Sequence, residues 1–167
     1  MALAEQTRLK VEPIKPQIGA RVLADKQALL SGEHAAELMD LLEQRGVLVF
    51  PQVSFSDEEQ IAFTNTLGKF TKEIRGADVY KVSLDPTVTA TAEYLKGAFF
   101  WHFDGSMSPA PVRASILSAK VLSPTGGDTD FCNTYAAFED LPDAEKKELE
   151  GLRAVHANTS AQLFPYG

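Results

Sequence analysis

The chain has 167 residues, 44% of them apolar and 23% charged, and a formal net charge of −7. This length and composition are typical of one globular domain, and the negative charge disfavours a nucleic-acid partner. Its single cysteine, Cys132, excludes an internal disulfide or a cysteine-rich zinc site, and no apolar run approaches the roughly 20 residues that span a bilayer. We therefore expect a cytoplasmic protein with no membrane partner, in which Cys132 is a buried small hydrophobic residue.

The first part of the chain contains clear signals for two helices. Before them, residues 11–14 fit a short edge strand, because the prolines there exclude it from a sheet centre. Apolar residues at helical spacing predict a helix over 31–46 that ends at a glycine, and residues 47–50 then form a short apolar strand. Ser56, followed by three acidic residues, predicts the start of a second helix that ends at Gly68.

The second part of the chain has strand-like patterns between turns. Alternation or short apolar runs predict strands at 79–84, 114–121, 129–133 and 152–156. Glycine and proline turns separate these segments, and a last helix is predicted at about 143–150. Helices followed by short strands predict an α+β fold in which an antiparallel sheet carries the chemistry.

Residues 101–104, Trp-His-Phe-Asp, hold the strongest chemical signal. Side chains at positions i and i+2 of a strand point to the same side, so His102 and Asp104 converge on one point. One histidine and one carboxylate are two of the three ligands of the 2-His-1-carboxylate site that holds non-haem Fe(II). The bare pattern is common by chance, and a surface or structural pair is the alternative interpretation.

The surroundings of this pair favour metal chemistry. Trp101 and the preceding Phe99-Phe100 pair supply an apolar flank, as expected for an oxygen-activating iron site that needs a dry cavity. Further along, two glycines at 126–127 allow a close backbone approach to a ligand, and Thr129 offers a hydroxyl donor to a carboxylate. A plain hairpin turn is the alternative interpretation of that Gly-Gly-Asp-Thr segment.

Ordered matches along nearly the whole chain resemble the taurine dioxygenase/chlorophenoxyacetate dioxygenase family. The motifs that carry this resemblance are residues 18–22, 45–51, 59–68, 101–106, 109–114, 126–129, 135–142 and 151–156. The resemblance implies a double-stranded β-helix (a jelly roll, clavaminate-synthase-like) with N-terminal helices packed outside the barrel.

The same resemblance implies a chemistry. It implies Fe(II) as the metal, with 2-oxoglutarate and O2 as cosubstrates. His102 and Asp104 carry over as the first two iron ligands, and Thr129 carries over as a contact to 2-oxoglutarate. The implied reaction is hydroxylation of a small organic substrate, with decarboxylation of 2-oxoglutarate to succinate.

Two residues that the family pattern requires come later than this sequence reaches: the second iron-binding histidine and the arginine that grips 2-oxoglutarate. We therefore expect residues 1–167 to form a single, C-terminally truncated dioxygenase domain with a partial jelly roll, weak iron binding and little activity alone. His156 fits the spacing of a third ligand in some other oxygenases, but its motif is not the ligand position, which favours an ordinary polar residue near the barrel rim. His34, between two glutamates of the first helix, is expected to face solvent.

Two other functions remain open at this point. One is a catalytically inactive remnant that acts as a binding or structural module, which succinate release coupled to O2 consumption would distinguish from an oxygenase. The other is a cupin-like metal hydrolase or isomerase, which would not require 2-oxoglutarate. The sequence does not name the primary substrate and leaves the oligomeric state, a homo-oligomer included, open.

Overall fold

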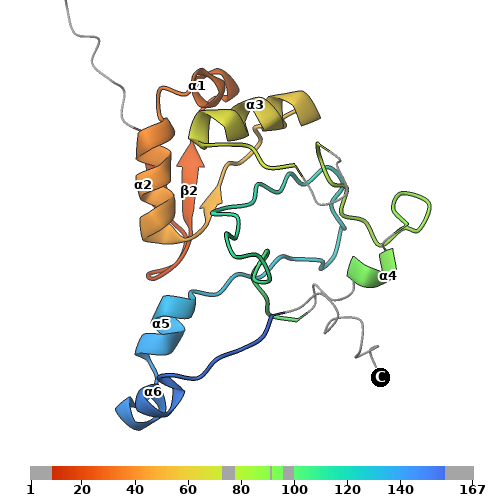
Figure 1. Cartoon of the computed structure of the whole chain (residues 1–167). Helices are drawn as coiled ribbons and strands as arrows, with labels where there is room; N and C mark the ends of the chain where they lie inside the picture. The colour runs from red at the N-terminus through yellow and green to blue at the C-terminus, as the bar shows by residue number, and fades with distance from the viewer. Residues whose placement is uncertain (1–8, 73–77, 91, 96–99, 157–167) are drawn as a thin grey trace, which may run out of the picture. The chain divides into compact units, whose positions relative to one another are not determined.

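The computed structural model describes residues 9–72, 78–90, 92–95 and 100–156. Its elements in chain order (Figure 1) are β1 Lys10–Pro13, β2 Ala20–Leu23, α1 Lys26–Ser31, α2 Ala35–Arg45, β3 Leu48–Val49, α3 Asp57–Leu67, α4 Ala92–Leu95, α5 Thr134–Glu139 and α6 Asp143–Leu149. The chain divides into two compact units, the first made of 1–70 and 116–147 and the second of 71–115 and 148–167. None of the described helices is long and apolar enough to cross a membrane.

A small mixed sheet lies in the first unit. Strand β1 pairs antiparallel with β2, with Val11 opposite Val22, and β2 pairs parallel with β3, with Ala20 opposite Leu48. Parallel neighbours need a crossover connection, and here α1 and α2 provide it between β2 and β3. The expected α+β character is therefore confirmed for this unit, although its sheet is mixed and not purely antiparallel.

Local capping signals set the ends of the two long helices. At the end of α2, Gly46 adopts φ 68° and its N–H donates to the Leu42 carbonyl over 2.7 Å. At the start of α3, the Ser56 hydroxyl accepts from the Glu59 N–H, while the Glu59 carboxylate accepts from the Ser56 N–H over 2.7 Å. This reciprocal capping box satisfies two N–H groups that a helix start leaves without partners. Both predicted helices and their glycine ends are confirmed.

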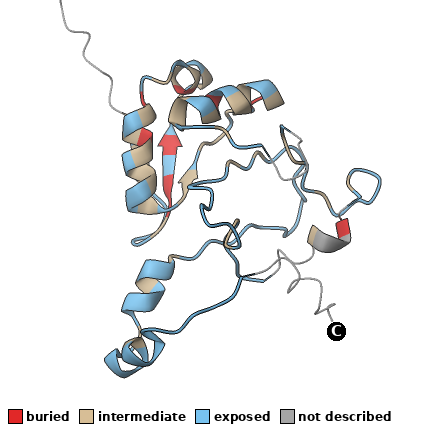
Figure 2. Ribbon diagram, viewed as in Figure 1, coloured by how far each residue is buried: buried red, intermediate tan, exposed pale blue. Residues whose placement is uncertain are grey.

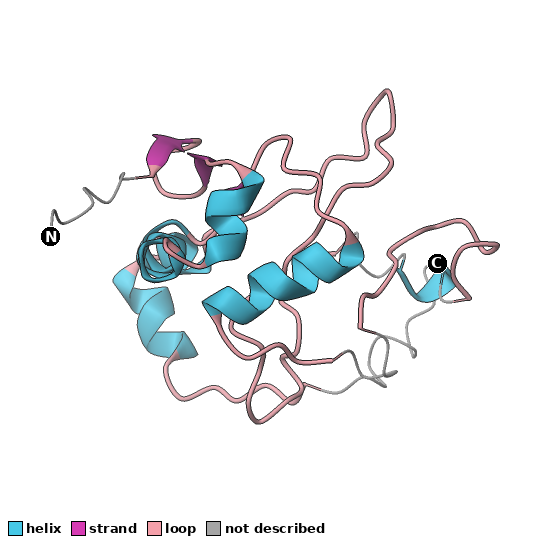
Figure 3. Ribbon diagram, turned by 90° about the horizontal axis from the view of Figure 1, so that it is seen from above, coloured by secondary structure: helices cyan, strands magenta, loops and turns pink. Residues whose placement is uncertain are grey.

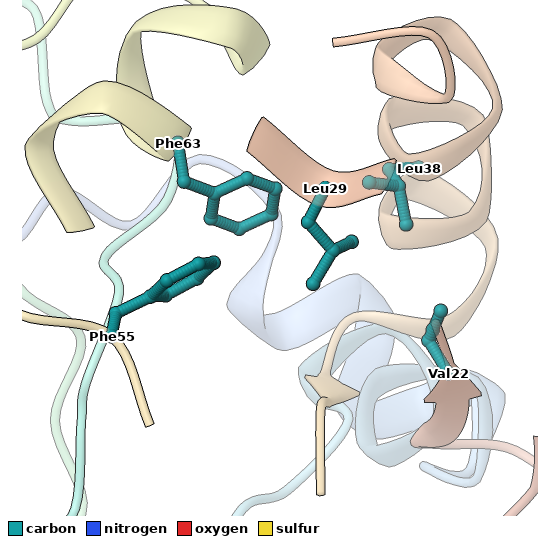
Figure 4. Packing of buried hydrophobic residues seen from close by; sticks show 5 residues of the cluster. All are labelled: Val22, Leu29, Leu38, Phe55 and Phe63. Atoms are coloured by element: carbon teal, nitrogen blue, oxygen red, sulfur yellow. The ribbon is translucent and has the colours of Figure 1, made fainter. Parts of the chain in front are cut away.

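The core of the first unit forms where α1, α2 and α3 pack on β2. Figure 4 shows its five members, which are Val22, Leu29, Leu38, Phe55 and Phe63. The Phe63 ring, on α3, meets the Phe50 ring edge-on at a centroid distance of 5.6 Å and the Phe55 ring at 5.3 Å. Such aromatic pairs add to the stabilisation that comes from burying apolar area. The packed aromatic cluster fixes α3 against the segment that precedes it.

Three side chains attach residues 116–120 to this core unit. The Gln60 amide donates from Nε2 to the Ile116 carbonyl over 3.0 Å, and Lys120 Nζ donates to the Phe55 carbonyl. Beside them, Lys26 Nζ, on α1, fixes the start of α3 by donating to the Ser54 carbonyl over 3.0 Å and to the Glu59 carboxylate over 2.7 Å. Ile116 itself packs against the buried cluster. These contacts hold the segment in place without a strand neighbour.

The expected strands in the second half of the sequence are not formed. Residues 79–84, 114–121, 129–133 and 152–156 are irregular, and Figure 3 draws the chain between 100 and 133 as loop. A strand exists only where a neighbouring backbone accepts and donates its hydrogen bonds, and the described residues provide no such neighbour here. Most side chains of these segments are exposed (Figure 2), and no closed barrel is present in the described part of the chain.

Two side chains lie differently from expectation. Cys132 was expected to be buried but is exposed, because the segment around it is not covered by a sheet. His34 was expected to face solvent but is only 9% exposed. It precedes α2 in a turn that packs close to α3, where a Cβ on Gly32 would lie 3.3 Å from the Thr66 Cβ. The His34 ring is held between carboxylates, 3.4 Å from Glu33 and 3.4 Å from Glu37.

Candidate metal centre

The structure brings His102 and Asp104 together in the second unit. His102 Nε2 lies 3.6 Å from Asp104 Oδ1, as the i and i+2 spacing predicts. Two atoms bound to one metal at about 2.1 Å each can be no more than about 4.2 Å apart, so this pair fits a shared ion. The side chains are 50% and 68% exposed, which leaves them accessible to a ligand.

The other ring nitrogen of His102 has a partner that suits metal binding. His102 Nδ1 lies 2.7 Å from the Phe100 carbonyl oxygen, and a carbonyl can only accept, so Nδ1 must carry the hydrogen. Metal-binding histidines commonly donate their second ring N–H in this way, which fixes the ring and its tautomer. The Nε2 atom, which faces the carboxylate, then offers its lone pair to a metal ion. The donor set therefore fits a divalent cation.

A tight turn follows the pair immediately. Gly105 has φ 74°, a conformation that L residues with a side chain rarely adopt, and its carbonyl accepts from the Ser108 N–H over 2.9 Å. Beyond the turn, the Ser108 hydroxyl donates to the Ala110 carbonyl over 3.0 Å. Phe99, expected in the apolar flank, lies outside the described residues.

No third ligand joins the pair among the residues that the structure describes, since no group of three His, Cys, Asp or Glu side chains there could hold a metal. His156 lies in the same unit, but it contacts Phe103, with ring centroids 5.8 Å apart. The interpretation of His156 as a residue other than a ligand stays a prediction. Nothing in the sequence signals the contact, because 53 positions separate the two rings.

Thr129 belongs to the first unit and is exposed there. The two glycines before it have φ 64° and 77°, the left-handed region that favours glycine, and the chain bends just before them, at 124–125. The Ser123 hydroxyl donates to the Thr125 carbonyl over 2.7 Å across the bend at 124–125. A contact of Thr129 with 2-oxoglutarate stays a prediction.

Sequence comparison identifies the family. The family described as taurine catabolism dioxygenase TauD, TfdA family matches residues 10–163. The chain belongs to this family.

Curated relatives within it are α-ketoglutarate-dependent, α-ketoglutarate being another name for 2-oxoglutarate. The 2,4-dichlorophenoxyacetate dioxygenase of Burkholderia sp. (strain RASC) is 39% identical over 152 residues, which cover 79% of this chain and 51% of the relative. The enzyme of the same name from Cupriavidus pinatubonensis (strain JMP 134 / LMG 1197) is 36% identical over 162 residues, covering 86% and 56%. The chain thus spans about half the length of the curated relatives it matches.

Solved structures share the fold. A crystal structure of AAD-2 in complex with Mn(II) and N-oxalylglycine matches with a TM-score of 0.74 at 27% identity, covering 93% of this chain and 64% of that one. A putative α-ketoglutarate-dependent 2,4-D dioxygenase from Burkholderia xenovorans matches with a TM-score of 0.64 at 25% identity, covering 95% and 62%. N-oxalylglycine is an analogue of 2-oxoglutarate, so the AAD-2 structure holds a metal ion together with a cosubstrate analogue.

Proposed function

We propose that this chain carries the first two metal ligands of an Fe(II)- and 2-oxoglutarate-dependent dioxygenase that hydroxylates a small organic substrate. In the reaction, 2-oxoglutarate is decarboxylated to succinate. The observation that carries the proposal is the facing pair His102 and Asp104, 3.6 Å apart, in a chain of the TauD/TfdA family. The bound Mn(II) and 2-oxoglutarate analogue in the related AAD-2 structure support it.

Each residue has a distinct role in this proposal. His102 binds the iron through Nε2, because its Nδ1–H is held by the Phe100 carbonyl. Asp104 supplies a carboxylate oxygen and one negative charge to the same ion. Thr129 donates its hydroxyl to a carboxylate of 2-oxoglutarate. When bound, the iron supplies the activation of O2.

We also propose that both units belong to one dioxygenase domain. The family match extends through residues of both units, from 10 to 163. Relatives named for phenoxy acids and for sulfate esters support a small organic anion as the substrate. A 2-oxoglutarate requirement separates this function from that of a metal hydrolase or isomerase on a similar barrel.

A second candidate is a catalytically inactive remnant that only binds ligands or another chain. Two observations favour it. The metal pair is half-exposed, and no third ligand accompanies it among the described residues. Two protein ligands hold a metal more weakly than three, so the chain alone would then bind a metal without turnover.

Succinate formation and O2 consumption distinguish the two candidates. The chain is incubated with Fe(II), 2-oxoglutarate and 2,4-dichlorophenoxyacetate, and both quantities are measured for wild type and Asp104→Ala. The dioxygenase predicts a low level of succinate with an equal loss of O2, as expected for a chain that binds iron weakly, and both are abolished by Asp104→Ala. Metal binding with no succinate would support the inactive remnant. Succinate that forms equally well in Asp104→Ala would contradict Asp104 as a metal ligand.

A further inference from the structure

A ring contact joins the metal motif to a distant part of the second unit. Phe103 lies between the two proposed ligands, and its ring centroid is 5.8 Å from that of His156, with the ring planes inclined by 50°. This distance and tilt fall in the range of favourable aromatic pairs. Both residues belong to the second unit, so the contact does not depend on how the two units are arranged.

The contact engages the residue that stands between the two proposed ligands. His102 Nε2 and Asp104 Oδ1 meet over 3.6 Å, so these two side chains point to one side. The Phe103 backbone joins the two ligands, so a restraint on its ring bears on the positions of both. The His156 ring is therefore placed to support the backbone that carries the two ligands.

We infer that His156 is a positioning residue for the metal site, acting through Phe103. The inference rests on the proposed function, since it assumes that His102 and Asp104 bind the metal. Phe103 is 64% exposed, and the contact of its ring with His156 restricts the ring and the backbone on either side of it. The two ligands are then held on one side before the metal arrives, and less conformational freedom is lost on binding.

The first test measures Mn(II) affinity in the presence of N-oxalylglycine, using the electron paramagnetic resonance signal of free Mn(II). His156→Ala should weaken binding about 3- to 10-fold, the effect that one aromatic pair supports. His156→Phe should stay within about twofold of wild type, because it keeps a ring but has no metal-binding nitrogen. Thermal unfolding of both variants should match wild type, since His156 is exposed.

A second test uses non-additivity. If His156 acts through Phe103, Phe103→Leu lowers the Mn(II) affinity, and His156→Ala then adds little to that loss. The single tryptophan, Trp101, adjoins the motif, so its emission without metal should shift in His156→Ala and return in His156→Phe.

The outcomes separate the inference from the proposed function. Wild-type affinity in His156→Ala would overturn the positioning role and leave the metal site intact. Equal loss in His156→Ala and His156→Phe would overturn it in favour of a ligand nitrogen. Failure of wild type to bind Mn(II) at all would overturn the proposed metal site and this inference with it.

Discussion

The side-chain amide of Gln60 donates from Nε2 to the Ile116 carbonyl over 3.0 Å, across 56 positions of sequence. Its other amide atom, Oε1, is buried and has no hydrogen-bond partner among the described residues. Gln60 thus gives the Ile116 carbonyl one hydrogen bond of the kind that a neighbouring strand would provide. The Lys120 contact to the Phe55 carbonyl supports the same segment, which leads to the predicted 2-oxoglutarate contact at Thr129.

Replacing Gln60 tests this attachment. Gln60→Glu places a carboxylate against the Ile116 carbonyl and should lower the free energy of unfolding by about 2–3 kcal/mol or more, since neither group can donate. Gln60→Met leaves one carbonyl unsatisfied but removes the orphan oxygen, so the loss should be nearer 1 kcal/mol. Urea unfolding gives both values. Equal stability of the two variants would show that the amide does not hold the segment.

The Glu59 carboxylate predicts acid sensitivity of the first unit. The hydrogen bond from Lys26, and then that from the Ser56 N–H, lower the pKa of Glu59 below its usual value. A lowered folded-state pKa means that the contribution to stability is complete above the ordinary value of about 4.3 and is lost as the pH falls through the lowered pKa. Glu59→Gln should therefore be less stable than wild type at pH 7, and the difference should shrink at acidic pH.

Urea unfolding midpoints at a series of pH values measure this difference. Asp40→Asn, which removes an exposed carboxylate of α2, is the matched control and should follow the wild-type profile. A stability difference between Glu59→Gln and wild type that is constant with pH would contradict the account of the capping box and its lysine.

Phe63 tests the core that supports α3. Its side chain is 2% exposed and contacts two other aromatic rings, so Phe63→Ala should cost about 3–5 kcal/mol. Leu117→Ala, at a residue of the same unit that is 66% exposed, should cost less than about 1 kcal/mol. Chemical unfolding followed by circular dichroism measures both. Similar costs for the two substitutions would show that the aromatic cluster is not the core.

Local signals explain which elements the sequence predicted. The ends of α2 and α3 follow from Gly46 and Ser56, which act on the nearest turns only, and both were predicted. Helix α1 was missed because six residues are too few for a periodic pattern, although Asp25 caps it by accepting from the Ala28 N–H. The prediction of a strand at 114–121 was wrong. A strand depends on a neighbouring strand, and the residue pattern of a segment does not show whether one is present.

The candidate site likewise combines features that local sequence predicted with features that depend on distant residues. The proximity of His102 and Asp104, two positions apart in the sequence, was predicted, although the strand on which the prediction relied is not formed. The contact between Phe103 and His156 joins positions far apart in the sequence, and no residue pattern indicated it. The burial of His34 likewise depends on a turn that packs near α3, so its two glutamate neighbours suggested the wrong environment.

Calorimetric titration with Mn(II) and N-oxalylglycine is the most direct test of the metal site. The account predicts that the analogue binds only when Mn(II) is present, and that His102→Ala and Asp104→Ala each weaken Mn(II) binding at least about tenfold. His34→Gln, which removes a histidine of the first unit, should bind as wild type does. Unchanged Mn(II) binding in His102→Ala and Asp104→Ala would contradict the assignment of this pair as the metal ligands.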